Sequence, residues 1–317
     1  MNIVLTGSIA FDYLMTFPGY FRDHILPDKL DRLSLSFLVD SLTRRPGGIA
    51  ANIAYTLALL GERPQVMATV GEDFEQHRRR LEAEGVDTSG IVTVPDTFTA
   101  SFFVNTDLAN AQIASFFTGA MAHAVELHFA DLKPVPDLAV ISANDPQAMS
   151  SYVSECKERG LPYMYDPSQQ VVRLEAHVIR QCLSGCLGLF ANDYEFSLIE
   201  DKTGAGLEEI RSMAEIVVIT RGEAGADLHT PQETIHVPAV RPERIADPTG
   251  VGDAFRGGFL KGYMHGLSLA SCGKMGALAA AYCLENQGTQ GHRFTLTDFV
   301  TRFRKQFDDR GELDRLL

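Results

Sequence analysis

The sequence is short of positive charge, and this shortage limits the partners that the protein can have. It carries 28 Lys and Arg residues against 41 Asp and Glu residues, which gives a formal net charge of −13. Nucleic acids and anionic membrane surfaces are bound by clusters of Lys and Arg. We therefore expect neither as a partner. The same deficit raises the question of how so acidic a chain could handle phosphate.

Cysteines and long apolar runs are also scarce. The five cysteines form no C-x-x-C pair, so we expect reduced thiols and a cytoplasmic protein. The longest apolar stretch, near Met275–Leu284, is about half of a membrane span. The opening segment MNIVLTGSIAFDYLM has no basic n-region, and we expect no signal peptide. The histidines show no H-x-x-x-H spacing, and we assign them no metal.

Short β-branched runs alternate with helical patterns along the chain. The strand-like runs are Ile3–Thr6, Gln65–Val70, Leu138–Ser142, Tyr163–Tyr165, Leu187–Ala191 and Ile216–Thr220. The helical patterns are Gly48–Leu60, Asp73–Glu84, Gln147–Arg159, Val171–Leu183, Leu207–Ala214, Gly252–His265 and Leu269–Leu284. This alternation predicts an α/β fold with a mostly parallel sheet flanked by helices. We expect one catalytic domain over residues 1–317.

One stretch breaks the alternation. Between Gly90 and Gly119 two strand-like segments, Phe98–Asn105 and Gln112–Phe117, follow each other with no helix between them. We predict a small antiparallel β-lid, formed by residues 13–42 and 90–119 and inserted in the catalytic domain. Lids of this kind exclude water from a reacting phosphate.

The most specific segment is Asp247–Gly258, where Gly250 and Gly252 run directly into a helical pattern. Glycines let the backbone approach an anion, and the amides of a helix N-terminus then point at it. Phosphate could thus be held without net positive charge. Asp253 in the first turn is suited to accepting a proton from an attacking hydroxyl. By itself, the segment is equally compatible with a capped helix after a glycine turn.

Five segments, in the same order, resemble those of the PfkB/ribokinase family of kinases. They are Gly7–Asp12, Gly47–Asn52, Asn192–Glu195, Thr220–Gly225 and Asp247–Asp253. The resemblance implies a ribokinase-like fold that uses ATP with Mg²⁺. The spellings D-P-T-G-V-G-D at 247–253 and D-P-S-Q-Q at 166–170 are most similar to the bacterial members that phosphorylate adenosine.

The resemblance also implies roles for individual residues. Asp253 would be the general base toward the 5′-hydroxyl, with the amides of Gly250, Val251 and Gly252 as an anion hole. The residues implied in substrate binding are Ser8, Asp12, Gly48 and Asn52 at the ribose, Phe102 and Phe116 stacked on the adenine, and Gln169 or Gln170 at its edge. Those implied at ATP are Asn192, Glu195, Thr220, Gly222 and Gly225, with Glu195 acting on Mg²⁺ through water. Asp247 and Thr249 resemble a monovalent-cation site, although the family varies in its use of K⁺.

The function implied is ATP-dependent phosphorylation of adenosine to AMP, a purine-salvage reaction. Three alternatives stay open: a ribokinase-type sugar kinase, a kinase of another nucleoside, and a non-catalytic nucleoside-binding regulator. The expected partners are the small molecules adenosine and ATP. A homodimer through the lid would cover its sheet, since bare sheet edges tend to be paired.

Overall fold

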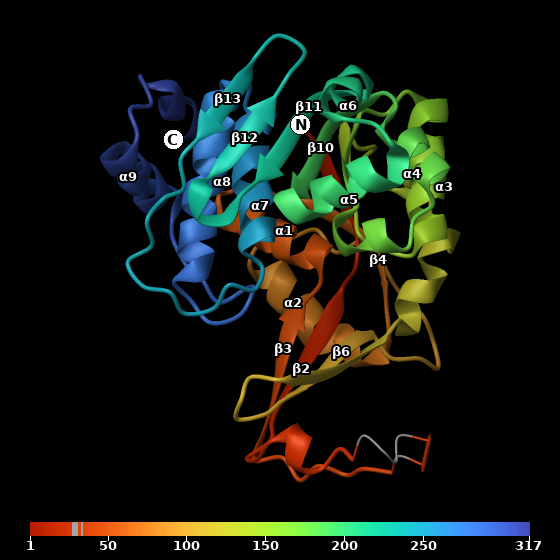
Figure 1. Ribbon diagram of the computed structural model, residues 1–317. Coiled ribbons are helices and arrows are strands. Elements are labelled where there is room, and N and C mark those ends of the chain that lie inside the picture. The colour runs from red at the N-terminus through yellow and green to blue at the C-terminus, as the bar shows by residue number, and fades with distance from the viewer. Residues whose placement is uncertain (27–30, 33) are drawn as a thin grey trace.

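A large sheet runs through the residues that the computed structural model describes, which are 1–26, 31–32 and 34–317. In the described chain it has nine strands in the order β13-β12-β11-β10-β9-β8-β1-β4-β5 (Figure 1). The strands from β5 to β11 are parallel, and β12 and β13 add an antiparallel edge. Their bounds are β1 Ile3–Thr6, β4 Gln65–Val70, β5 Ile91–Thr93, β8 Leu138–Ser142, β9 Tyr163–Asp166, β10 Cys186–Asn192, β11 Ala214–Thr220, β12 Ala226–His229 and β13 Thr234–Val237.

Helices cover both faces of this sheet. One face carries α1 (Ile49–Leu59), α2 (Glu75–Ala83), α7 (Val251–Met264), α8 (Leu269–Leu284) and α9 (Leu296–Gln306). The other carries α3 (Pro146–Arg159), α4 (Ala176–Leu183), α5 (Asp193–Thr203) and α6 (Leu207–Met213). Leu5 of β1 packs in the first core and Val4 in the second, because successive strand residues point to opposite faces. The predicted α/β architecture is confirmed.

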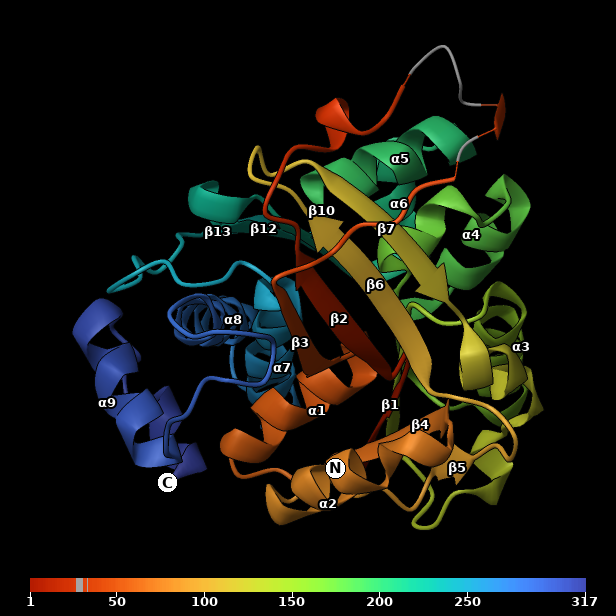
Figure 2. The ribbon, with the colours of Figure 1, turned by 90° about the horizontal axis from the view of Figure 1, so that it is seen from below.

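A second, smaller sheet stands off the large one, below it in Figure 1 and nearest the viewer in Figure 2. Its order is β3-β2-β6-β7, with β2 Ala10–Thr16, β3 Ser41–Gly47, β6 Ala100–Thr106 and β7 Gln112–Phe117. We call these four strands the small sheet. The two strands predicted between Gly90 and Gly119, β6 and β7, are antiparallel as expected, whereas β2 joins the insertion by a parallel pairing with β6. Strands β2 and β6 follow β1 and β5, which point the same way in the large sheet. Residues 27–30 and 33, within the first predicted lid segment, lie outside the described residues.

One predicted helix is partly wrong. The first residues of the predicted helix Val171–Leu183 belong to a 3₁₀ turn, Ser168–Val172, and α4 begins only at Ala176. Val171 and Leu174 are both buried, so their spacing imitates a helical face although the backbone at Glu175 is extended. The five cysteines are buried and unpaired, which matches the expectation of free thiols. Among the described helices, none combines the length and the apolar character needed to cross a bilayer.

Candidate active site

Several of the residues predicted for the site lie at the carboxyl ends of the parallel strands. Ser8 follows β1, Asn192 ends β10 and Thr220 ends β11. Asn192 and Thr220 lie side by side in the parallel register. Asp166, at the end of β9, lies at the same edge. In open α/β sheets, ligands bind at this edge, and the fold places Ser8 and Thr220 at the same edge of one sheet although they are far apart in the sequence.

Asn192 and Glu195 form a capping box at the start of α5. Asn192 Oδ1 accepts a hydrogen bond from Glu195 N (2.8 Å), and Glu195 Oε2 accepts one from Asn192 N (2.9 Å). Glu195 is buried, and its Oε1 accepts from Ser168 Oγ at 3.4 Å. The N-x-x-E spacing would have predicted α5, which the sequence reasoning missed. Its carboxylate keeps lone pairs free to orient magnesium-bound water, so the residue fits the implied ion.

The turn Thr220–Gly225 joins β11 to β12. Gly225 has φ +90°, and a Cβ there would lie 2.1 Å from the carbonyl oxygen of Val237, so only glycine fits. Gly225 N donates to Gly222 O (3.1 Å), and Arg221 N donates to Gly225 O (2.8 Å), which closes the turn. This closed turn follows directly on β11 at the carboxyl edge, where the resemblance implies the nucleotide.

The segment Gly250–Gly252 forms the N-terminus of α7, as predicted for an anion hole. Gly250 is the N-cap with φ +77°, and a Cβ there would come within 2.8 Å of Thr289. The first amides of a helix have no partner inside it and carry the positive end of the helix dipole. An anion can therefore bind at this point without a cationic side chain.

Asp253 and Asn52, predicted as base and ribose ligand, are in direct contact. Asn52 Nδ2 donates to Asp253 Oδ2 at 2.8 Å. Asn52 Oδ1 accepts from Gln290 Nε2 at 2.9 Å, and Gln290 is only 2% exposed. Sequence reasoning missed Gln290, because nothing in its local sequence marks a partner 238 residues away. Burial raises the pKa of Asp253, against the opposing effects of Arg256 and the Asn52 hydrogen bond.

Asp12 belongs to a row of side chains that crosses the small sheet. The register pairs Asp12 of β2 with Arg45 of β3 and with Phe102 of β6, and Phe102 with Phe116 of β7. Residues that are directly opposite in a sheet share a face. Phe102 is half-buried, and Phe116 is 50% exposed. Burial raises the pKa of Asp12, against the Arg45 charge, while Asp247 adds to the rise.

Arg45 ties this row to the glycine segment. Its Nη1 donates to Asp247 Oδ2 at 2.8 Å, and its Nη2 donates to Gln287 Oε1 at 3.1 Å. Asp247 Oδ2 also accepts from Gly288 N, and Asp247 Oδ1 accepts from Thr249 N, both at 3.0 Å. Burial opposes ionisation of Asp247, but these hydrogen bonds and the Arg45 charge together lower its pKa. The carboxylate already has a counter-ion, so this donor set does not fit the implied monovalent cation.

The remaining predicted substrate residues are placed as follows. Gly48 is the N-cap of α1, and Ser8 Oγ accepts from Ile49 N at 3.3 Å, so Ser8 holds the start of that helix. Gln169 is exposed in the 3₁₀ turn after β9. Gln170 is half-buried, and its Oε1 atom is buried without a hydrogen-bond partner. An unpaired buried amide oxygen is costly unless a ligand donates to it.

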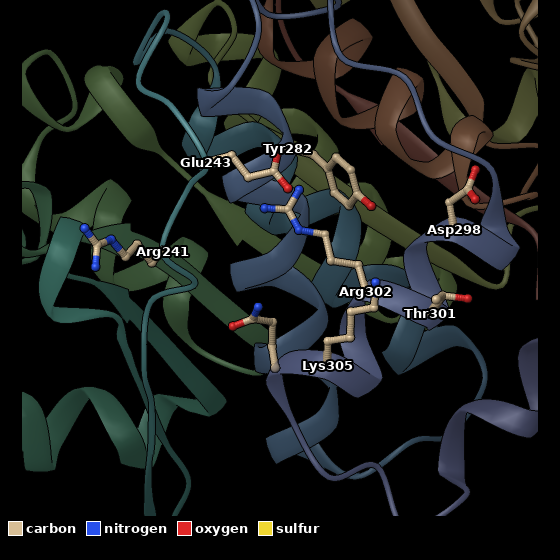
Figure 3. Close-up of a pocket in the computed structure, with 8 residues that line it drawn as sticks. Arg241, Glu243, Tyr282, Asp298, Thr301, Arg302 and Lys305 are labelled. Carbon is tan, nitrogen blue, oxygen red and sulfur yellow. The ribbon is translucent and has the colours of Figure 1, made fainter.

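A separate hollow of about 330 Å³ lies between α8, α9 and the segment after β13. In Figure 3 the Arg302 guanidinium lies between Glu243 and the Tyr282 ring. Arg302 is bound in two places by Glu285, at 2.6 and 2.8 Å, and lies 4.4 Å from the Tyr282 ring centre. None of the predicted site residues lines this hollow, and the Arg302 charge is neutralised locally. This hollow is therefore separate from the predicted site residues.

The family follows from these features together with a direct comparison. Residues 12–294 match the model of the pfkB family of carbohydrate kinases. The chain therefore belongs to the PfkB family, and the resemblance inferred from the five motifs is confirmed.

Within that family the chain is similar to nucleoside kinases. A nucleoside kinase of Methanothermobacter thermautotrophicus is 28% identical over 310 residues, which cover 96% of each chain. A structure of Burkholderia thailandensis nucleoside kinase in complex with inosine is 38% identical, has a TM-score of 0.86, and is matched over 96% of this chain and 98% of that one. The nucleoside kinase of Methanocaldococcus jannaschii, an archaeal member of the ribokinase family, is 25% identical with a TM-score of 0.86, over 96% of this chain and 99% of that one. The ribokinase-like fold is confirmed.

Proposed function

We propose that the protein transfers the γ-phosphoryl group of ATP to the 5′-hydroxyl of a nucleoside, and that adenosine is the preferred nucleoside. The observation that carries this proposal is the row Arg45–Asp12–Phe102–Phe116 on one face of the small sheet. A carboxylate suits the vicinal hydroxyls of a ribose, and two aromatic rings suit a flat base. A sugar without a base would leave both rings without a partner. With adenosine the product is AMP, a purine-salvage reaction.

In the proposed reaction the 5′-oxygen bonds to the γ-phosphorus, and the bond from that phosphorus to the ADP oxygen breaks. The hydroxyl proton passes to Asp253, whose carboxylate Asn52 holds in place. The amides of Gly250–Gly252 stabilise the charge on the transferring group, which is where phosphoryl-transfer catalysis is concentrated. When bound with ATP, Mg²⁺ would neutralise phosphate charge, with Glu195 as the residue that holds its water.

The edge of the base is the finer part of the proposal. The buried, unpaired Oε1 of Gln170 supports adenosine, because the amino group of adenine can donate to it. The complex of the Burkholderia relative with inosine supports a wider range of purine nucleosides. We further propose that the small sheet acts as the lid that shields the nucleoside from water.

A panel of acceptors tests the function. ADP formation is measured with adenosine, inosine, guanosine, cytidine, ribose and fructose, each with ATP and Mg²⁺. We expect adenosine to have the highest kcat/KM. A higher kcat/KM for ribose or fructose would contradict the nucleoside proposal, and no turnover with bound nucleoside would favour a regulator.

The effect of monovalent cations is a separate prediction. Because Arg45 already forms an ion pair with Asp247, we expect equal rates of ADP formation in potassium and choline salts.

The variant Phe102→Ala tests whether the Phe102 ring stacks on the base of the nucleoside. We expect it to lower kcat/KM for adenosine by roughly 10-fold or more, since stacking on a base contributes about 1–3 kcal/mol. Phe103→Ala is the matched control, because Phe103 lies on the opposite face and stacks on Tyr13 with a centroid distance of 4.7 Å. Equal losses in the two variants would argue against stacking by Phe102.

We also propose that a second copy covers the opposite face of the small sheet. The exposed apolar side chains there are Leu42, Phe103, Ile113 and Phe117, which are 63%, 38%, 43% and 46% exposed. Exposed apolar patches of this kind mark interaction surfaces. Light scattering is expected to give a dimer for the native protein and a monomer for Ile113→Glu. A monomeric native protein at micromolar concentration would contradict this.

A further inference from the structure

A buried guanidinium lies directly under the proposed anion hole. Arg256 is on α7, one turn after Asp253, and is 7% exposed. Its Nη1 atom is 4.0 Å from Asp253 Oδ1. A Cβ on residue 252 would lie 2.8 Å from the same Nη1 atom. The guanidinium therefore packs against the glycine segment at Gly252, where a side chain would displace it.

Asp166 holds this guanidinium from the other side. Arg256 Nη2 donates to Asp166 Oδ1 at 2.7 Å, and Nε lies 2.6 Å from Asp166 Oδ2 in an ion contact that is not aligned as a hydrogen bond. Asp166 is fully buried, and burial raises its pKa to about 7 despite the Arg256 charge. Replacing a buried ion pair by apolar residues is often neutral or stabilising. Stability alone therefore does not account for this pair.

The charges around Arg256 come from three elements. Burial lowers the pKa of the guanidinium, but the charges of Asp166 on β9, Asp253 on α7 and Glu195 on α5 outweigh it and raise that pKa. The guanidinium is one cation among three carboxylates, at the point where the γ-phosphate would add further negative charge. Although the net charge of the chain is negative, this site therefore contains a fixed positive charge.

We propose that Arg256 is a positioning residue for phosphoryl transfer: anchored by Asp166, it orients the Asp253 carboxylate and places a fixed positive charge beside the anion hole at Gly250–Gly252. This inference rests on the proposed function. Asp253 can then act as a base inside a buried site, because a neighbouring cation favours its ionised form. Asp166 holds the guanidinium in place, and its own negative charge acts directly on Asp253 as well.

The test compares Arg256→Gln, Arg256→Lys and Asp166→Asn with Lys261→Gln. Lys261 is the matched control, a cation on the same helix that is 3% exposed and paired with Glu62. For each variant the pH profile of kcat/KM and the melting temperature are measured. We expect Arg256→Gln to lower kcat by roughly 10²-fold, as for the loss of one oxyanion donor. On the acid side of the pH profile (the acid limb), kcat/KM falls as Asp253 is protonated. In Arg256→Gln this fall should occur at higher pH than in the native protein, because the cation that favours ionised Asp253 is gone.

The other variants separate positioning from structure. Arg256→Lys keeps the charge and should leave the acid limb near its native pH. Asp166→Asn removes a negative charge and should move the limb to lower pH while kcat falls. Lys261→Gln should lower only the melting temperature. If Arg256→Gln leaves the limb in place, or shifts only the melting temperature as Lys261→Gln does, the inference is overturned.

Two further outcomes are also decisive. If Arg256→Gln does not fold, an unchanged limb in both Arg256→Lys and Asp166→Asn overturns the inference, and a shift in Asp166→Asn alone supports it. If the native protein prefers a sugar, the nucleoside proposal fails. The same pH profiles are then measured on that sugar, where the inference stands or falls separately.

Discussion

Asp253→Asn is expected to lower kcat for nucleoside phosphorylation by about 10²–10⁴-fold, the usual contribution of a general base. The variant keeps the shape of the side chain and an oxygen that can accept from Asn52, so the fold and nucleoside binding should persist. Steady-state ADP formation, calorimetric binding of adenosine and thermal unfolding measure these three quantities.

The pH dependence gives a second reading of the same residue. Burial raises the pKa of Asp253 above its ordinary 3.8, so we expect kcat/KM to fall as pH drops through that raised value and the base is protonated. Asp298→Asn is the control, since Asp298 is also in the first turn of a helix but lies on α9. A native-like kcat in Asp253→Asn would sink the assignment of the base.

Asp12→Ala should have the next largest effect, a loss of about 10²-fold in kcat/KM, mostly as a higher KM. Hydrogen bonds to a charged group contribute about 1.5–3 kcal/mol each, and a ribose offers two hydroxyls to this carboxylate. Adenosine is compared with its 2′-deoxy and 3′-deoxy analogues. Asp12→Ala should lose most for adenosine and little for the analogue that lacks the contacted hydroxyl.

Asp23→Ala is the control for this comparison, because Asp23 follows β2 in the chain but its side chain is 62% exposed and lies 3.8 Å from Arg22 in a surface ion pair. It should leave all three kcat/KM values near native. An equal loss in Asp12→Ala for adenosine and both deoxy analogues would show that Asp12 does not contact the ribose hydroxyls.

Local sequence patterns were enough for most of the regular structure. Ile3–Thr6 and Leu269–Leu284 have the predicted bounds, because their apolar spacing coincides with one strand and one helix. The helix predicted from Val171 was wrong at its start, because the same spacing served a 3₁₀ turn. The parallel pairing of β2 and β6 was beyond local reasoning, since it depends on the direction in which β1 and β5 leave the large sheet.

In the candidate site, too, some features could be predicted from local sequence and others could not. Glycine segments and an acidic residue at a helix start are local features, so Gly250, Gly252 and Asp253 could be proposed from their spacing. The contacts that surround the site residues join segments far apart in the sequence. Gln290 reaches Asn52 across 238 residues and Arg45 reaches Asp247 across 202. Nothing in the spacing of either pair indicates its partner.

By itself, the sequence determined the family and the alternation of strands and helices, and it led to the proposal of a phosphate site that uses backbone amides, because these depend on residues close together in the chain. The shortage of basic residues in the sequence does not predict the charge inside a buried site. Only the tertiary structure decided that one of those few cations, Arg256, is buried beneath the glycine segment with Asp166 as its partner. The physical reason is that a buried charge must be paired, and the partner of this helix residue comes from strand β9, 90 residues away.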